Sequence, residues 1–354
     1  MWSVTTGSQA DAWYVQLKCE VIVEHVRQVE LMQALVVYCH NWLELVGAYE
    51  MLKSTKSVLL MAVASAMLFS QSESLADSAT TGIPIRYAAG HMIVIPVKVN
   101  DIETNFVLDT GAGVNVISQT LAEKLACRSD GKVTGQRMSG QKVTMKLVNL
   151  SSLRIGSCRK KNLPMATWKL EDAFAGAPEL AQVDGLVSLE FFKNIPFTID
   201  YAQKMVFIED NESLKMRVSR GVSIPIQVSS KPNQTSVTML VWFSNGSHAK
   251  VEVDTGSGAL ILDEHYMREL GVNQNSIDVK TVQGVDETGY SYVRYFTKLP
   301  LDVFLAQNRQ FTQIKPNVQF QKIIYDGLIG DGFMRNFTVT YDLPHKRIIF
   351  ERYQ

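Results

Sequence analysis

The sequence lacks the residue patterns that mark most metal, redox and nucleic-acid-binding proteins. Its four cysteines include no Cys-x-x-Cys pair, and its six histidines form no His-Glu-x-x-His segment. Lysine plus arginine and aspartate plus glutamate balance at 35 each, and no basic stripe with interleaved aromatic residues occurs. We therefore expect no metal, no cofactor and no nucleic-acid partner.

Two of the cysteines, Cys127 and Cys158, leave two interpretations open. In an oxidising compartment they would form a disulfide. Alternatively, they are two buried thiols that act as small apolar side chains. The sequence favours neither interpretation.

Long apolar runs are also scarce, and the one that stands out is too short to be a membrane anchor. Residues 58–69 are twelve consecutive apolar or small residues, whereas a spanning helix needs about 20. A short basic segment, residues 51–56, precedes the run, and small residues around Ala76 follow it. This layout is typical of a secretory signal, here residues 51–76. It predicts a secreted or periplasmic bacterial protein without stable membrane insertion after signal cleavage.

A secretory signal belongs at the start of a chain, yet fifty residues precede this one. Our interpretation is that Met51 is the true start and that residues 1–50 are a mis-assigned extension. The alternative is a genuine helix within residues 12–50, for which residues 21–37 are apolar enough.

The most informative feature is a short stretch that occurs twice. Residues 107–118 read VLDTGAGVNVIS, and residues 252–263 read EVDTGSGALILD. In each copy an apolar run leads into Asp-Thr-Gly, with Asp109 in the first and Asp254 in the second, 145 positions apart (254 − 109). An acidic residue that ends a buried strand is costly unless its charge has a use or a partner. The repeat therefore predicts that the two carboxylates meet in one site.

The rest of the chain repeats with nearly the same spacing. Asp-Gly-Leu begins at Asp184 and again at Asp326. A short helix is expected after each Asp-Thr-Gly segment, at residues 119–125 with Ser118 as N-cap, and at residues 264–270. Short β-rich runs bounded by turn residues fill the remainder. A period this long is typical of two copies of one domain rather than of a solenoid.

We therefore expect two domains of similar construction. They cover residues 82–210 and 222–354, and the polar stretch at residues 211–221 is interpreted as the linker between them. Two similar halves that each offer one aspartate favour a pseudo-twofold arrangement with the carboxylates facing one another across the axis.

Such a pair of carboxylates has a definite chemistry. Two carboxylates in contact do not both ionise easily, so they share one proton and one of the two pKa values rises. The pair can then hold a water molecule, deprotonate it and protonate a departing amide nitrogen. This reaction needs no metal and no serine or cysteine nucleophile.

The two Asp-Thr-Gly segments and the two later Gly-Leu-Val-Ser and Gly-Leu-Ile-Gly segments resemble those of the aspartic peptidases. The closer resemblance is to bacterial members that carry two retropepsin-like domains in one chain, a counterpart of the pepsin arrangement, and it covers about residues 82–354. It implies an all-β, bilobal acid-protease fold with two pseudo-twofold-related, β-barrel-like domains and short helices. It also implies a monomeric endopeptidase that acts on peptide or protein substrates, with Asp109 and Asp254 as the catalytic dyad. The residues implied to support the dyad are Thr110, Gly111, Thr255 and Gly256.

The resemblance also implies a flap, a β-hairpin that closes over the substrate. Residues 134–146 in the first half and residues 282–292 in the second are the two candidates, both polar and glycine-containing. The sequence does not choose between them. Tyr290 and Tyr292 are the expected substrate contacts.

One position departs from the family pattern. The family places a glycine after the second apolar residue of each later turn, as at Gly330 in the second half, but the first half has Ser188 there. We expect the serine to impose a slightly different turn on the first half.

Two other functions remain as alternatives. A protein on the same fold could capture peptides without cutting them, since fold does not dictate function. The presence of both aspartates argues against this reading. A structural envelope protein tethered by an uncleaved segment at residues 51–76 is the third class, and membrane fractionation tests it.

Overall fold

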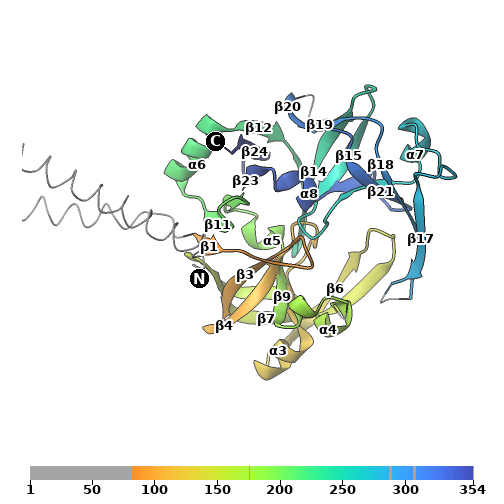
Figure 1. Ribbon diagram of the computed structural model, residues 1–354. Helices are drawn as coiled ribbons and strands as arrows, with labels where there is room; N and C mark the ends of the chain where they lie inside the picture. Colours follow the sequence, from red (N-terminus) through yellow and green to blue (C-terminus); the bar gives the residue numbers. More distant parts are fainter. Residues whose placement is uncertain (1–81, 175, 287–288, 306–307, 354) are drawn as a thin grey trace, which may run out of the picture. The chain divides into compact units, whose positions relative to one another are not determined.

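The structure is a computed structural model that describes residues 82–353, apart from residues 175, 287–288 and 306–307 (Figure 1). The interpreted extension at residues 1–50 and the interpreted signal at residues 51–76 lie outside the described residues. Among the residues that are described, no helix is long and apolar enough to cross a membrane.

The described chain is mostly β, as the sequence predicts, and its helices are short. Residues of the first half build an eight-stranded sheet in the order β2-β3-β4-β9-β5-β8-β7-β6, and β3 also pairs with β7. Its strands are β2 (Arg86–Ala88), β3 (Met92–Val99), β4 (Ile102–Leu108), β5 (Val116–Ser118), β6 (Ser129–Gln136), β7 (Lys142–Ile155), β8 (Cys158–Trp168) and β9 (Val183–Val187). The helices of this half are α3 (Gln119–Lys124), α4 (Leu170–Ala173), the 3-10 turn η3 (Pro178–Leu180) and α5 (Leu189–Phe192).

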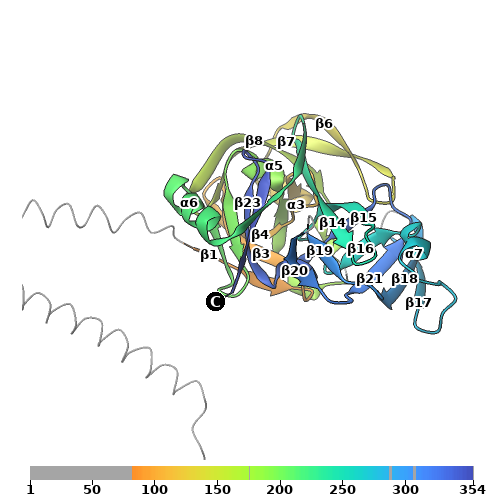
Figure 2. The ribbon, with the colours of Figure 1, turned by 90° about the horizontal axis from the view of Figure 1, so that it is seen from above.

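The second half builds a ten-stranded sheet in the order β17-β18-β21-β16-β22-β15-β14-β19-β20, with β13 paired to β14. Its strands are β13 (Gln227–Lys231), β14 (Gln234–Phe243), β15 (His248–Val253), β16 (Leu260–Asp263), β17 (Lys280–Val285), β18 (Ser291–Lys298), β19 (Val303–Leu305), β20 (Asn308–Gln313), β21 (Asn317–Gln321) and β22 (Gly327–Ile329). Its helices are α7 (Tyr266–Glu269) and α8 (Asp331–Met334). The strands of the two halves gather in different regions in both ribbon views (Figures 1 and 2).

A third sheet is shared by the two halves. Its order is β1-β11-β10-β23-β24-β12, with β1 (Ile83–Pro84), β10 (Phe197–Asp200), β11 (Met205–Ile208), β12 (Val222–Pro225), β23 (Phe337–Asp342) and β24 (Arg347–Arg352). The halves join where β10 and β23 pair antiparallel. At this seam the rings of Phe197 and Tyr341 stack with centroids 4.7 Å apart, and the hydroxyls of Thr198 and Thr340 are 2.7 Å apart. The two halves are therefore joined by continuous backbone hydrogen bonding.

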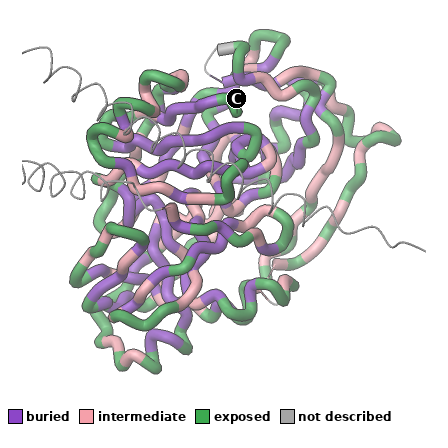
Figure 3. The backbone as a smooth tube through the Cα atoms, turned by 60° about the vertical axis from the view of Figure 1, so that its left-hand side comes forward, coloured by how far each residue is buried: buried purple, intermediate pink, exposed green. Residues whose placement is uncertain are grey.

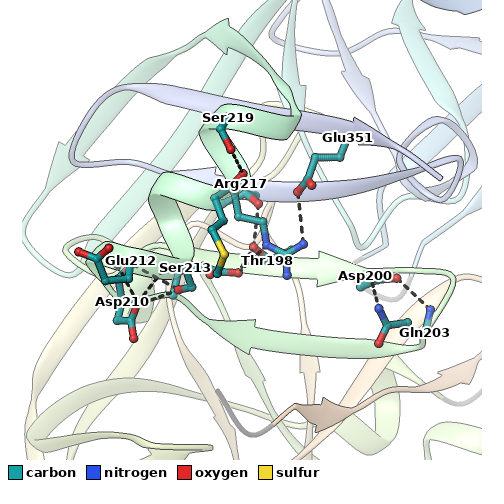
Figure 4. Close-up of polar contacts among 12 residues, drawn as sticks. Thr198, Asp200, Gln203, Asp210, Glu212, Ser213, Arg217, Ser219 and Glu351 are labelled. Atoms are coloured by element: carbon teal, nitrogen blue, oxygen red, sulfur yellow. Dashed lines mark hydrogen bonds and ion pairs between the residues drawn. The ribbon is translucent and has the colours of Figure 1, made fainter. Parts of the chain in front are cut away.

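The stretch interpreted as a polar linker is a helix, α6 (Asn211–Arg220). Asp210 caps its N-terminus by accepting from the backbone N–H groups of Glu212 and Ser213, and the Ser213 side chain accepts from the backbone N–H of Asp210 (Figure 4). The Arg217 guanidinium of this helix forms ion pairs at the shared sheet. Its Nε lies 3.0 Å from a carboxylate oxygen of Glu209, just after β11, and its Nη1 lies 3.3 Å from one of Glu351 on β24. Sequence reasoning did not identify this helix, because only Leu214 is buried and the segment therefore has little apolar periodicity.

The buried hydrophobic side chains form one principal cluster that includes residues of all three sheets. Figure 3 shows in purple which parts of the chain are buried. Strand alternation explains it, since every second residue of β14 is buried. Cys127 and Cys158 are free thiols that pack partly buried against this cluster. The thiol interpretation therefore describes these cysteines, and the disulfide is not formed.

The expected helices are found with altered lengths. Ser118 caps α3 by accepting from the backbone N–H of Leu121 at 3.1 Å, as expected. The expected helix at residues 264–270 is reduced to the single turn α7, because Glu264 and His265 form a turn after β16 and Leu270 already serves as the C-cap.

Candidate active site

Each Asp-Thr-Gly segment begins where a buried strand ends. Asp109 follows β4 and Asp254 follows β15. Both strands lie parallel to the strand of the later Gly-Leu segment, β9 in the first half and β22 in the second. The backbone N–H of Asp109 donates to the carbonyl of Val187 at 2.9 Å, and that of Asp254 donates to Ile329 at 3.0 Å. In each half, the later Gly-Leu segment thus holds the backbone of the Asp-Thr-Gly segment in place and fixes the position of its aspartate.

Two threonines bind the loops of the two halves to each other. The backbone N–H of Thr110 donates to the Thr255 hydroxyl at 3.0 Å, and the backbone N–H of Thr255 donates to the Thr110 hydroxyl at 3.0 Å. Each hydroxyl also donates across the axis, Thr110 to Val253 at 2.7 Å and Thr255 to Leu108 at 2.8 Å. Both threonines are fully buried, so all of these polar groups find their partners inside the protein.

The glycines allow the two carboxyl groups to approach. Gly111 and Gly256 donate backbone N–H bonds to the preceding aspartates, at 3.0 Å to Asp109 and 2.8 Å to Asp254. A Cβ at Gly111 would lie 2.5 Å from the Asp254 Cγ, and one at Gly256 would lie 2.9 Å from the Asp109 Cγ. Only glycine fits at these positions, because each carboxyl group lies against the glycine of the opposite loop.

The electrostatics of the pair favour one retained proton. Burial raises the pKa of Asp109, while the backbone N–H of Gly111 and the Asp254 side chain oppose this rise. The pKa of Asp254 is raised well above its ordinary value, first by burial and then by the negative charge of Asp109. The structure therefore favours Asp254 as the protonated partner and Asp109 as the charged one.

Ser188 does not impose a different turn on the first half. Its φ and ψ are −105° and 178°, close to the −111° and −169° of Gly330 in the equivalent turn. This is extended backbone that any residue adopts. Ser188 also gains contacts, because its backbone N–H donates to the Asn115 side chain at 2.9 Å and its hydroxyl accepts from the Glu190 N–H at 3.2 Å.

Both flap candidates are β-hairpins, but their surroundings differ. In the β6–β7 hairpin of the first half, the carbonyl of Met138 accepts from the backbone N–H of Ile324 at 2.9 Å. The Thr134 carbonyl of the same hairpin accepts from the Gln234 side chain at 3.1 Å. This hairpin therefore spans to the second half. The β17–β18 hairpin meets it at the tip, where Asp286 lies 3.7 Å from Arg137.

The two tyrosines expected to touch substrate make their contacts within the β17–β18 hairpin. The Arg294 guanidinium lies over the Tyr292 ring at 3.9 Å from its centroid. The backbone N–H of Tyr290 donates to the Asp286 carboxylate at 3.0 Å. These contacts lie along their own hairpin rather than at the two aspartates, because Tyr292 is on β18 and Tyr290 is in the turn that leads into it, and β17 and β18 are at the edge of their sheet.

Three residues near the aspartates were missed by sequence reasoning. The two ring nitrogens of His91 face backbone carbonyls, those of Ala89 at 3.0 Å and Gly256 at 3.1 Å, and its charge lowers the pKa of Asp109. Glu252 is 9% exposed, and burial followed by the charge of Asp109 raises its pKa to about 7. Tyr325 packs against the cluster of Ile261, Ile323 and Leu328, and Leu328 is the strand partner of Glu252. Strand alternation could have revealed Glu252, two residues before Asp254, whereas nothing in the sequence connects His91 or Tyr325 with the pair.

Comparison with known proteins agrees with this geometry for the first half. Residues 95–191 match the family model described as aspartyl protease, which includes Asp109 and the turn at Ser188. No curated protein matches the chain. The match supports an aspartic peptidase family for this protein.

Proposed function

We propose that the protein is an aspartic endopeptidase in which Asp109 and Asp254 activate the water that attacks the peptide bond. The observation that carries this proposal is the reciprocal hydrogen bonding of Thr110 and Thr255, which sets the two carboxyl groups against each other. The family match in the first half supports it independently.

The mechanism follows from the protonation of the pair. Asp109 is the charged carboxylate and takes a proton from the water as its oxygen attacks the carbonyl carbon. The proton on Asp254 hydrogen-bonds to the carbonyl oxygen, which becomes a hydroxyl in the tetrahedral intermediate. The proton taken up by Asp109 is then delivered to the leaving nitrogen while the C–N bond breaks, and Asp254 takes back a proton from a hydroxyl of the intermediate as the carboxylic acid product forms. Both carboxyls thus exchange roles and are restored with each turnover.

We further propose a bilobal arrangement with domains at residues 82–210 and 222–354. The separate eight- and ten-stranded sheets and their parallel construction around each aspartate support it. Residues 211–221 connect the domains through α6, and the shared sheet joins them. Since one chain supplies both aspartates, the enzyme is proposed to act as a monomer on peptide or protein substrates.

A secreted or periplasmic location is also proposed, from the signal-like segment at residues 51–76 alone. Sequencing the N-terminus of the protein purified from its own cells tests it. A mature chain that begins at Asp77 supports export, whereas a chain that retains residues 51–76 contradicts it.

The decisive test of the activity is cleavage of a mixed peptide library over acid and neutral pH. Asp254→Asn removes the proton carrier and should abolish cutting, as should a pepstatin-type transition-state analogue. Asp278→Asn, at an exposed position, is the matched control and should cut like the parent. No cutting by the folded parent at any pH would contradict the proposal and favour peptide binding without cleavage.

A further inference from the structure

Each Asp-Thr-Gly loop is contacted by a hairpin of the other half. At the start of β14, the backbone N–H of Thr235 donates to the carbonyl of Gly113 at 2.9 Å. In the other direction, the Nε2 of His91, in the turn between β2 and β3, faces the carbonyl of Gly256 at 3.1 Å. The two hairpins occupy equivalent places, because β3 pairs with β4 and β14 pairs with β15, the strands that lead to the aspartates. Each aspartate loop is therefore held by a segment of the half that carries the other aspartate.

The turn that carries His91 is anchored to the second half by further contacts. The Arg335 guanidinium of α8 donates to the carbonyl of Gly90 at 3.0 Å and lies over the Tyr87 ring, 5.6 Å from its centroid. Arg335 is itself held by an ion pair with the buried carboxyl of Asp331. Burial raises the pKa of Tyr87 to about 12, so this ring stays uncharged. The imidazole of His91 thus meets the other half from an anchored backbone.

Both nitrogens of the His91 ring face acceptors. Nδ1 lies 3.0 Å from the carbonyl oxygen of Ala89, and Nε2 lies 3.1 Å from that of Gly256. A Cβ at Gly258 would lie 3.1 Å from the Cγ of the ring, so the ring rests against this glycine. A neutral imidazole has one N–H and donates to only one of the two carbonyls, whereas the imidazolium donates to both. In the neutral form, a nitrogen lone pair therefore faces a carbonyl oxygen.

Charged groups from both halves face the ring. The charge of His91 opposes the rise that burial causes in the pKa of Asp109 and of Asp331. The loop that the ring contacts carries Asp254, and α8 also carries Arg335, whose charge is paired with that of Asp331. A pH effect at this place therefore originates either in the ring or in the carboxyl groups, and an experiment has to distinguish the two sources.

The two crossing contacts differ in chemistry. Thr235 contacts Gly113 through a backbone N–H, which does not titrate. His91 contacts Gly256 through an imidazole, a group that gains or loses a proton near neutral pH. The contact on the loop of the first half is therefore the same in acid and at neutral pH. On the loop of the second half, the ring holds both of its carbonyl partners only when it is charged.

We propose that His91 is a positioning residue that, as the imidazolium, ties the Asp254 loop to the β2–β3 turn of the other half. Loss of the ring proton removes one of its two hydrogen bonds, so the loop is held less firmly as pH rises. Gly256, whose carbonyl faces the ring, also donates its N–H to the Asp254 carboxylate at 2.8 Å. The backbone that orients this carboxyl therefore depends on the protonation of a residue in the first half. In its effect on catalysis, the inference rests on the proposed function.

The structural part of the test needs no substrate. The full protein is labelled with ¹⁵N in histidine and ¹³C at glycine carbonyl carbons, and the signals of the His91 ring and of Gly256 are followed by NMR from pH 3 to pH 9. Gly111 is the internal reference, because its N–H donates to the other aspartate in the same way. His91→Gln supplies an amide donor that does not titrate. His248→Gln, at an exposed histidine of β15, is the control.

We expect the Gly256 carbonyl signal to shift with the same midpoint as the His91 ring. This step should be absent from Gly111 and from Gly256 in His91→Gln, and it should persist in His248→Gln. A step that Gly256 and Gly111 share belongs to the aspartates. A Gly256 signal that follows only the shared step overturns the inference, even if the parent cuts peptides.

Catalysis gives a separate readout. His91→Ala should lower kcat for peptide cleavage in acid by on the order of tenfold with little change in KM, as expected for the loss of about one hydrogen bond. His91→Gln should restore most of this loss and should lack the fall in kcat at the His91 midpoint. Unchanged kcat over the whole pH range in folded His91→Ala overturns the inference. The NMR step in a parent that does not cut peptides upholds the positioning role and contradicts only the proposed function.

Discussion

Thr110 and Thr255 exchange backbone-to-hydroxyl hydrogen bonds of equal length, 3.0 Å in each direction, across the junction of the two halves. Residues 145 positions apart thereby hold each other's loops, and each loop carries one aspartate. The threonines are buried, so water cannot replace a lost partner.

Removal of one hydroxyl should disturb both loops. Thr255→Val leaves the N–H of Thr110 and the carbonyl of Leu108 without their partner. An unpaired buried polar group costs about 1–3 kcal/mol, so the free energy of unfolding should fall by roughly 2–4 kcal/mol, with a large loss of kcat. Thr255→Ser retains the hydroxyl and is the control. Equal denaturant stability of the two variants would contradict this role.

Alanine should be tolerated to different degrees in the equivalent turns of the two halves. A Cβ at Gly330 would lie 2.2 Å from the backbone carbonyl oxygen of Ser257, so Gly330→Ala should lower the free energy of unfolding by about 3 kcal/mol or more. Ser188→Ala loses only hydroxyl contacts, to Asn115 and the Glu190 N–H, and should cost about 1 kcal/mol. Urea unfolding of both variants measures the difference. If the two variants had the same free energy of unfolding, the close approach of Ser257 would not be what requires glycine at position 330.

The contact of the β6–β7 hairpin with the second half can be tested with two of its glycines. Gly140 has φ +87°, and a Cβ there would lie 2.9 Å from the Ile324 side chain. Gly131 has φ +102°, with no atom within 4 Å of a Cβ. Alanine at either position strains the backbone by about 1–2 kcal/mol, but only Gly140→Ala should push the hairpin from Ile324.

The readout is amide hydrogen exchange of Ile324, whose N–H donates to the Met138 carbonyl. We expect faster exchange at Ile324 in Gly140→Ala than in Gly131→Ala. Identical exchange in the two variants would show that the hairpin does not depend on this contact.

Glu252 should also make stability depend on pH. Its folded pKa of about 7 lies above the ordinary 4.5, so the folded state holds the proton more tightly than the unfolded state does. The contribution of Glu252 to the free energy of unfolding is therefore fully present below about pH 4.5 and is lost as pH rises through about 7. Glu252→Gln should match the parent at pH 4 and exceed its free energy of unfolding by ~2–3 kcal/mol at pH 8.

Thermal or denaturant unfolding at the two pH values measures this difference. Glu212→Gln, on the exposed face of α6, is the control and should change little at either pH. A Glu252→Gln protein less stable than the parent at pH 8 would show that the carboxylate contributes more by its contacts than it costs by its burial.

Local patterns in the sequence determined much of the fold. The short β-rich runs between turn residues are strands in the structure, and Ser118 caps α3 where the sequence predicts a helix to begin. The repeated Asp-Thr-Gly predicted that two carboxylates meet, since a strand-ending aspartate in an apolar setting needs a partner. These features depend on neighbours within a few residues, and such information is present in one stretch of sequence.

Tertiary structure decided what depends on distant neighbours. The pairing of β10 with β23 and the contact of α6 with β24 through Arg217 and Glu351 join elements far apart in sequence. The same holds for Tyr325, which packs against the cluster that contains Leu328, the strand partner of Glu252. The chain by itself determined which aspartates come together, because their local strands and glycines require it. Only the packed sheets decided that the Glu252 carboxyl interacts with the two aspartates, because charge interactions depend on distance in space and not on position in the sequence.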